Sequence, residues 1–200
     1  MNSNHLYEYI TLLARVLSVG YYLHYGSPVL EKDISYSSFF QKLEKDNDGS
    51  LYISEVNLIK EIYPDEKIDL MDVPTYNQCL WAAESYLRIQ DECKLSFEAI
   101  FLYIPLKDMY GYFVYYHEMD FSQIIDVFKE LYNKHSTLEL EIKKQKTSLK
   151  EMSEKTNIPY STLFSLKKRK RNIKEVNGKT IYAISSFLKI RMETLLEIAI

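Results

Sequence analysis

The sequence predicts a mainly α-helical protein with a helical N-terminal domain over residues 1–134 and a five-helix domain over residues 135–200. Apolar residues recur at helical spacing, as in the series Leu6, Ile10, Leu13 and Leu17. Helix start signals of the types Asp-x-x-Gln and Ser-x-x-Glu occur three times after residue 119. The 200 residues include only five glycines and five prolines, so few positions interrupt a helix.

The composition excludes several classes of protein. With 46% hydrophobic and 26% charged residues and no biased tract, the chain is not of the disordered or collagen-like kind. Its apolar runs are far shorter than the roughly 20 residues of a membrane span, and MNSNHLYEYI is no secretion signal. Cys79 and Cys93 are isolated, which is typical of reduced thiols. We therefore expect a cytoplasmic protein without a membrane partner, a disulfide or a zinc site.

Charge is unevenly distributed along the chain. Residues 143–200 contain fourteen Lys and Arg against five Asp and Glu, a balance of +9, whereas residues 1–142 contain eleven against twenty-three, a balance of −12. Basic residues neutralise phosphates and release the counterions condensed on nucleic acid. The asymmetry favours nucleic-acid binding by the C-terminal part, although a solvated basic face would have the same composition.

The N-terminal part contains further expected helices. Start signals and spacing predict one over residues 121–132. Residues 95–116 favour either two short helices or a small hairpin, and the pattern leaves both open. Sixteen of the eighteen tyrosines precede residue 135, which suits a core or a protein interface. Two more buried helix faces are indicated by Val56, Ile59 and Tyr63, and by Cys79, Ala83 and Tyr86.

The start and stop signals become regular after residue 135. Ser136 with Glu139 and Ser148 with Glu151 each form a capping-box sequence that opens a helix. Asn157 tolerates the left-handed backbone of a tight turn and ends the second of these helices. Ile158 fills the turn, Pro159 opens a third helix, and two amphipathic segments follow. Their inward residues are expected to be Leu149, Met152, Ser153, Leu163, Leu166, Ile181, Ile184, Leu188, Met192, Leu195, Leu196 and Ala199.

The stretch SLKEMSEKTNIPYSTLFSLKKRKRNI, followed by SSFLKIRMETLLE, resembles the lambda-repressor-like (XRE) family of helix-turn-helix domains. The resemblance covers residues 136–198. Ser153 stands at the family's small residue in the second helix, Asn157 at the turn residue, and Leu163 at the branched aliphatic of the recognition helix. The sequence departs from the pattern with Ser153 for alanine, Asn157 for glycine, and Lys168 and Arg169 where a glycine follows the recognition helix.

The resemblance implies contacts with double-stranded DNA, because in this family the third helix lies in the major groove. Its implied base-reading residues are Tyr160, Ser161 and Ser165, with Phe164 against a thymine methyl group. Core packing is the competing interpretation for the two aromatic residues. Thr162 is expected at a phosphate. The backbone grip would come from Lys167, Lys168, Arg169, Lys170 and Arg171, a run that also matches a nuclear-import patch.

The function implied by this resemblance is that of a sequence-specific transcriptional regulator that binds an operator as a homodimer through an N-terminal sensing or dimerisation domain. The alternative is an antitoxin-type or phage-defence protein, whose N-terminal domain neutralises a protein partner and whose C-terminal domain regulates its own gene. An enzyme with a DNA-binding tail is the third class. No phosphate-binding or hydrolase motif supports it, so we expect no enzyme and no cofactor.

Two other groups of polar residues are candidate metal sites. Glu44–Glu55 resembles an EF-hand calcium loop, with oxygen ligands at its first, third and fifth positions and Glu55 at its twelfth. Glu44 stands where aspartate is the rule and no second loop exists, so a surface turn is favoured. His117 and Glu118 with Asp120 lack metal-ligand spacing and favour surface polar groups. We expect no metal.

Overall fold

The computed structural model describes residues 6–22, 27–38, 41 and 74–197, and within these ranges the chain is helical and has no strand. Of the two alternatives for residues 95–116, the two short helices are confirmed, as α6 (Phe97–Tyr103) and α7 (Leu106–Tyr116), and the hairpin is wrong. The expected helix around Val56 and the Glu44–Glu55 loop lie outside the described residues. The helices are α1 (Leu6–Tyr22), α2 (Ser27–Tyr36), α5 (Tyr76–Cys93), α6 (Phe97–Tyr103), α7 (Leu106–Tyr116), α8 (Ser122–Lys134), α9 (Thr137–Lys144), α10 (Leu149–Thr156), α11 (Tyr160–Lys167), the 3-10 helix η3 (Ile173–Glu175), α12 (Gly178–Leu188) and α13 (Met192–Leu196).

The first hydrophobic cluster is built on the long contact between α1 and α5. Both helices bury residues at helical spacing, including Leu13 and Leu17 from α1 and Tyr86 from α5, as the sequence predicts. Gly20 allows α2 to approach α1, because a Cβ atom there would lie 2.6 Å from Leu30 Cδ1. The close approach explains why this helix position carries glycine despite its lower helix propensity.

Helix α6 lies at the centre of the molecule. All seven of its residues are buried, and the Ser96 hydroxyl caps its start by accepting from the Ala99 N–H. Phe101 packs edge-to-face on Tyr86, with ring centroids 4.8 Å apart. A 3.6-residue periodicity cannot identify such a helix, because every face is buried and no exposed polar face alternates with an apolar one. The predicted helix over residues 121–132 is confirmed as α8.

The second hydrophobic cluster joins α9 to α13 and consists of C-terminal residues alone. Ser136 and Ser148 cap α9 and α10 by accepting the N–H groups of Glu139 and Glu151, as the sequence predicts. Asn157 ends α10 with a φ of 55°. The five expected helices are confirmed, and η3 is an addition that the apolar pattern does not reveal. The boundary at residue 134 stays a prediction, because Leu140 of α9 packs against the first cluster.

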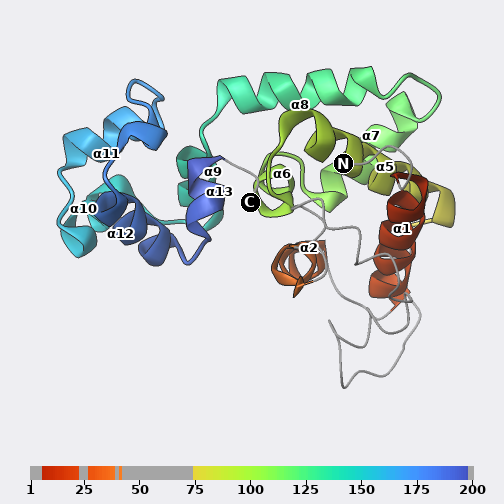
Figure 1. Cartoon of the computed structure of the whole chain (residues 1–200), viewed down its shortest axis with the longest axis horizontal. Helices are drawn as coiled ribbons and strands as arrows, with labels where there is room; N and C mark the ends of the chain where they lie inside the picture. Colours follow the sequence, from red (N-terminus) through yellow and green to blue (C-terminus); the bar gives the residue numbers. More distant parts are fainter. Residues whose placement is uncertain (1–5, 23–26, 39–40, 42–73, 198–200) are drawn as a thin grey trace.

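Figure 1 shows the arrangement of the two parts along the long axis of the molecule. Helices α10, α11 and α12 lie at one end and α1 lies near the other, while α8 runs along one side and leads into α9. Between them, α6 contacts both α9 and α13. Among the described residues, no helix is long and apolar enough to cross a membrane.

Candidate nucleic-acid interface

The turn between α10 and α11 fixes the angle between the two helices. Asn157 takes the left-handed conformation, and Ile158 buries its side chain beneath the turn. The Ser153 hydroxyl donates to the Ile158 carbonyl at 2.6 Å, so a serine at the family's small position adds a bond across the turn. Met152 and Leu163 are fully buried between the helices. This packing leaves the opposite face of α11 toward solvent.

The outward face of α11 carries aromatic and hydroxyl side chains. Tyr160 is 52% exposed and Phe164 is 38% exposed, and their rings lie 6.3 Å apart in a stacked arrangement. Core packing is therefore not the role of these two residues. Ser161 is exposed, whereas Thr162 and Ser165 are half-buried. The Ser165 hydroxyl donates to the Ser161 carbonyl at 2.8 Å, so its proton is engaged within the helix.

The basic residues at the end of α11 fall into two groups. Lys170 and Arg171 are exposed and form no ion pair among the described residues, and the Lys170 ammonium lies 5.9 Å from the centre of the Phe164 ring. Lys168 approaches the Glu139 carboxylate at 4.0 Å. The backbone carbonyl of Lys167 accepts from the Ser136 hydroxyl at 2.8 Å. The free cation of Lys170 therefore lies beside the aromatic face of α11.

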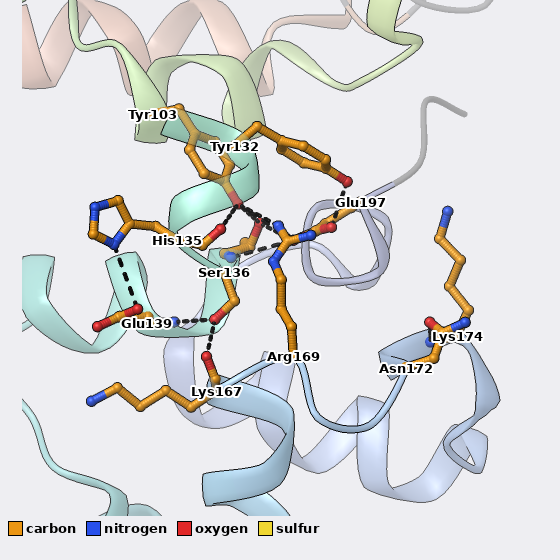
Figure 2. A network of polar contacts seen from close by, with 11 residues as sticks. Tyr103, Tyr132, His135, Ser136, Glu139, Lys167, Arg169, Asn172, Lys174 and Glu197 are labelled. Atoms are coloured by element: carbon orange, nitrogen blue, oxygen red, sulfur yellow. Dashed lines mark hydrogen bonds and ion pairs between the residues drawn. The ribbon is translucent and has the colours of Figure 1, made fainter. Parts of the chain in front are cut away.

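The Arg169 side chain points in a different direction from the side chains of its neighbours. Its backbone has a φ of 52°, a left-handed conformation, at the place where the family pattern has glycine. Figure 2 shows the side chain extending from α11 toward Tyr103, Tyr132 and Glu197. Its Nη2 atom lies 2.8 Å from Glu197 Oε1 and 3.1 Å from Tyr103 Oη, and the guanidinium lies 4.5 Å from the centre of the Tyr132 ring. The guanidinium faces the protein, which disfavours the predicted phosphate contact.

The Glu197 carboxylate is the hub of this network. It also accepts hydrogen bonds from Tyr132 Oη at 2.6 Å and from Thr137 Oγ1 at 3.0 Å. Burial, together with the bond to Glu197, raises the pKa of Tyr132 to about 12. Burial lowers the pKa of Arg169, but the Glu197 charge and the contacts with Tyr103 and Tyr132 together outweigh it, so the net direction is upward. Arg169 stays charged and Tyr132 neutral across the physiological range.

A second group of contacts surrounds the buried Glu98 of α6. Its carboxylate accepts from Arg191 Nε at 3.2 Å, from Tyr36 Oη at 2.7 Å and from the Thr194 hydroxyl. We call both groups of contacts together the polar seam, because they join the N-terminal part to α13 and to the chain after α11. Its members are Tyr36, Glu98, Tyr103, Tyr132, Arg169, Arg191, Thr194 and Glu197.

The other groups considered for metal binding have ordinary surroundings. The His117 ring stacks on Phe113 with centroids 4.4 Å apart, and its Nε2 atom lies 3.7 Å from Glu118. Within residues 6–22, 27–38, 41 and 74–197, no cluster of three or more His, Cys, Asp or Glu residues could hold a metal ion.

The family model of the Cro/C1-type HTH DNA-binding domain matches residues 138–199, which span α9 to α13 and include α11. The match confirms the resemblance found in the sequence and identifies the C-terminal part as a helix-turn-helix domain that supports a DNA-binding regulator. No family model matches the N-terminal part. No curated protein and no solved structure matches the chain at a significant level.

Proposed function

We propose that the protein is a sequence-specific transcriptional regulator that inserts α11 into the major groove of an operator. The observation that carries this proposal is the exposed face of α11, where Tyr160, Ser161 and Phe164 are exposed and the Lys170 ammonium lies near the Phe164 ring, with the exposed Arg171 following in the chain. Side chains of this kind at the start of a recognition helix reach base edges, and cations at its end reach phosphates. The match of residues 138–199 to a DNA-binding domain supports the same function.

The proposed roles follow the exposure of each side chain. Ser161 presents its hydroxyl to base edges and Phe164 presents its ring to a thymine methyl group. Tyr160 and Ser165 flank them, while Thr162, Lys167, Lys168, Lys170 and Arg171 position the backbone of the duplex. Arg169 is assigned to the polar seam in place of the phosphate grip.

In this proposal the protein acts in the cytoplasm, by binding and without a catalytic step. A single module of this size buries too little surface to select one site among many, so two copies bind a two-fold operator. Residues 1–134 supply the dimer contact or sense a signal.

The test begins with selection of bound fragments from the source genome at a fixed salt concentration. Enrichment of one sequence is expected. On that sequence, Ser161→Ala should weaken binding by about 1–3 kcal/mol and have little effect on random DNA. The matched control is Ser186→Ala, at an exposed serine of α12, which should change neither the affinity for the enriched sequence nor the affinity for random DNA. Absence of any enriched sequence, or an equal effect of Ser161→Ala on both DNAs, would contradict the proposal.

A second candidate function, an antitoxin-type or phage-defence role, is favoured by the surface at the C-terminal end of α7 and just after it. Val114 is 66% exposed, Tyr115 72% and Met119 53%, and exposed apolar side chains in a group suit a protein partner. The discriminating experiment expresses the protein together with the product of an adjoining basic reading frame. If Tyr115→Lys abolishes protection from that product but leaves DNA binding intact, the antitoxin role holds.

A further inference from the structure

A hollow of about 710 Å³ lies between the N-terminal part and α9, the first helix of the helix-turn-helix domain. Its walls are mainly apolar and include Phe101 and Leu102 of α6, Pro105, and Leu140 of α9. A volume of several hundred Å³ with apolar walls is typical of a site for a small molecule. Because its residues come from both parts of the chain, a bound molecule would contact both.

One buried carboxyl group interrupts the apolar wall. Glu31 of α2 is 7% exposed, and its Oε1 atom accepts from the backbone N–H of Leu106 at 2.7 Å. No other hydrogen bond reaches this carboxylate among the described residues, so its second oxygen retains free acceptor capacity beside the hollow. A carboxylate oxygen without a protein donor can accept a hydrogen bond from a ligand in the hollow.

The charged residues around Glu31 lie at the mouth of the hollow. Lys107 and Asp108 of α7 and Lys144 of α9 are exposed, and the Lys144 ammonium lies 4.0 Å from the Glu141 carboxylate. Burial raises the pKa of Glu31 to about 7, although the Leu106 N–H and the Lys144 charge lower it and Asp108 raises it. Lys107 and Lys144 line the hollow together with Asp108, and the Lys144 charge compensates the ionised Glu31 carboxylate only in part, because burial still raises its pKa.

We propose that this hollow binds a small molecule with a primary ammonium group on an apolar body. The ammonium donates to the free oxygen of Glu31, and the body packs on Phe101, Leu102 and Leu140. A carboxylate accepts more strongly from an ammonium than from a neutral hydroxyl, so an amine is preferred over the matching alcohol. An anionic ligand would meet the Glu31 carboxylate at the apolar wall and is disfavoured. The site requires no DNA binding and stands apart from the proposed function.

The test is a calorimetric titration of the full chain with hexylamine and with hexan-1-ol. At pH 8 the amine should bind more tightly than the alcohol. Lowering the pH to 6 should weaken amine binding about tenfold, since Glu31 is then mostly protonated, and should leave the alcohol unchanged. Glu31→Gln, which retains an acceptor for Leu106, should weaken amine binding about tenfold and remove its pH dependence. Asp108→Asn is the matched control at the exposed mouth and should keep the preference for the amine.

A second variant tests the location. Leu140→Trp places a larger side chain in the wall on which the apolar body packs, and it should weaken binding of both probes at least tenfold while the helical circular dichroism is kept. Failure of the wild type to bind hexylamine, equal binding of amine and alcohol, or binding unchanged by Glu31→Gln would each overturn the proposal. Binding of both probes to Leu140→Trp as to the wild type would place them elsewhere and overturn it too.

Discussion

The Arg169 guanidinium and the Glu197 carboxylate lie 2.8 Å apart, so the residue that follows the recognition helix is tied to the residue that ends α13. Both residues have positive φ angles, 52° and 55°. A left-handed conformation costs a non-glycine residue roughly 1–2 kcal/mol. The ion pair and the bonds to Tyr103 and Tyr132 offset that cost at Arg169. Because the Arg169 side chain is 35% exposed, solvent screens part of the gain.

Because the backbone strain and the side-chain contacts of Arg169 oppose each other, two substitutions of this residue should differ in their effect on the free energy of unfolding. Arg169→Ala loses the ion pair and keeps the strain, so the free energy of unfolding should fall by about 1–2 kcal/mol. Arg169→Gly loses the same contacts but relieves the strain, so its loss should be smaller by about 1 kcal/mol. Urea unfolding measures both. Arg171→Ala, an exposed neighbour, is the control and should be neutral. An Arg169→Gly variant less stable than Arg169→Ala would show that strain is unimportant there.

The same geometry predicts how salt affects DNA binding. Lys170→Ala removes a free cation, so the slope of log affinity against log salt concentration should flatten by about one unit, with equal losses on operator and random DNA. Arg169→Ala should leave the slope unchanged, because that guanidinium is already neutralised by Glu197. Titrations at several salt concentrations give the slopes, with Lys107→Ala of α7 as the control. A flattened slope for Arg169→Ala would show that Arg169 contacts a phosphate after all.

The turn between α10 and α11 predicts a stabilising substitution. Asn157 has a φ of 55° and its side chain makes no hydrogen bond among the described residues. Asn157→Gly should raise the free energy of unfolding by about 0.5–1 kcal/mol, whereas Asn157→Ala should lower it by about 1 kcal/mol. Thermal unfolding of the two variants checks the signs. If Asn157→Gly is the less stable of the two, the conformation of this turn is not left-handed.

Glu31 predicts a pH dependence of stability. Its pKa is raised from 4.5 to about 7 in the folded protein, so the folded state binds more protons than the unfolded state between these values. The free energy of unfolding should therefore fall as the pH rises from about 4.5 to 7, by up to about 3 kcal/mol, and level off above. Glu31→Gln has no ionisable group at this position, so its free energy of unfolding does not fall in this way. The difference in free energy of unfolding between the variant and the wild type should therefore shift in favour of the variant as the pH rises. Glu141 also has a raised pKa and contributes equally to both proteins. Urea unfolding at pH 5, 6, 7 and 8 measures the difference, and a constant difference would contradict the expectation.

Local signals explain how much of the C-terminal part could be predicted. The caps at Ser136 and Ser148, the turn at Asn157 and the start of α11 after Pro159 each depend on residues within five positions, and each is found where the sequence predicts it. The exposed face of α11 follows from the same periodicity. These features need no knowledge of the rest of the molecule.

The polar seam could not be predicted in this way. Arg169 meets partners 28, 37 and 66 residues away in the chain, and no spacing rule joins positions so distant. The missing glycine after the recognition helix was the one local sign of something unusual at this point. The sequence of α6, apolar apart from Glu98 and the hydroxyl of Tyr103, likewise has no clear helical periodicity, so only the packed structure decides between helix and hairpin.

The polar seam has a geometric consequence for a dimer formed through residues 1–134. Glu98 and Arg191 are both largely buried, and separating the two parts would break this pair as well as the packing of α6 on α9 and α13. In such a dimer each α11 would be held at a fixed distance from the other. Operators for such a dimer should have one invariant spacing between half-sites, and inserting half a helical turn, about five base pairs, would place one arm on the wrong side of the duplex. For such a dimer, the length of the spacer would be as much a part of the recognised sequence as the bases proposed to contact α11.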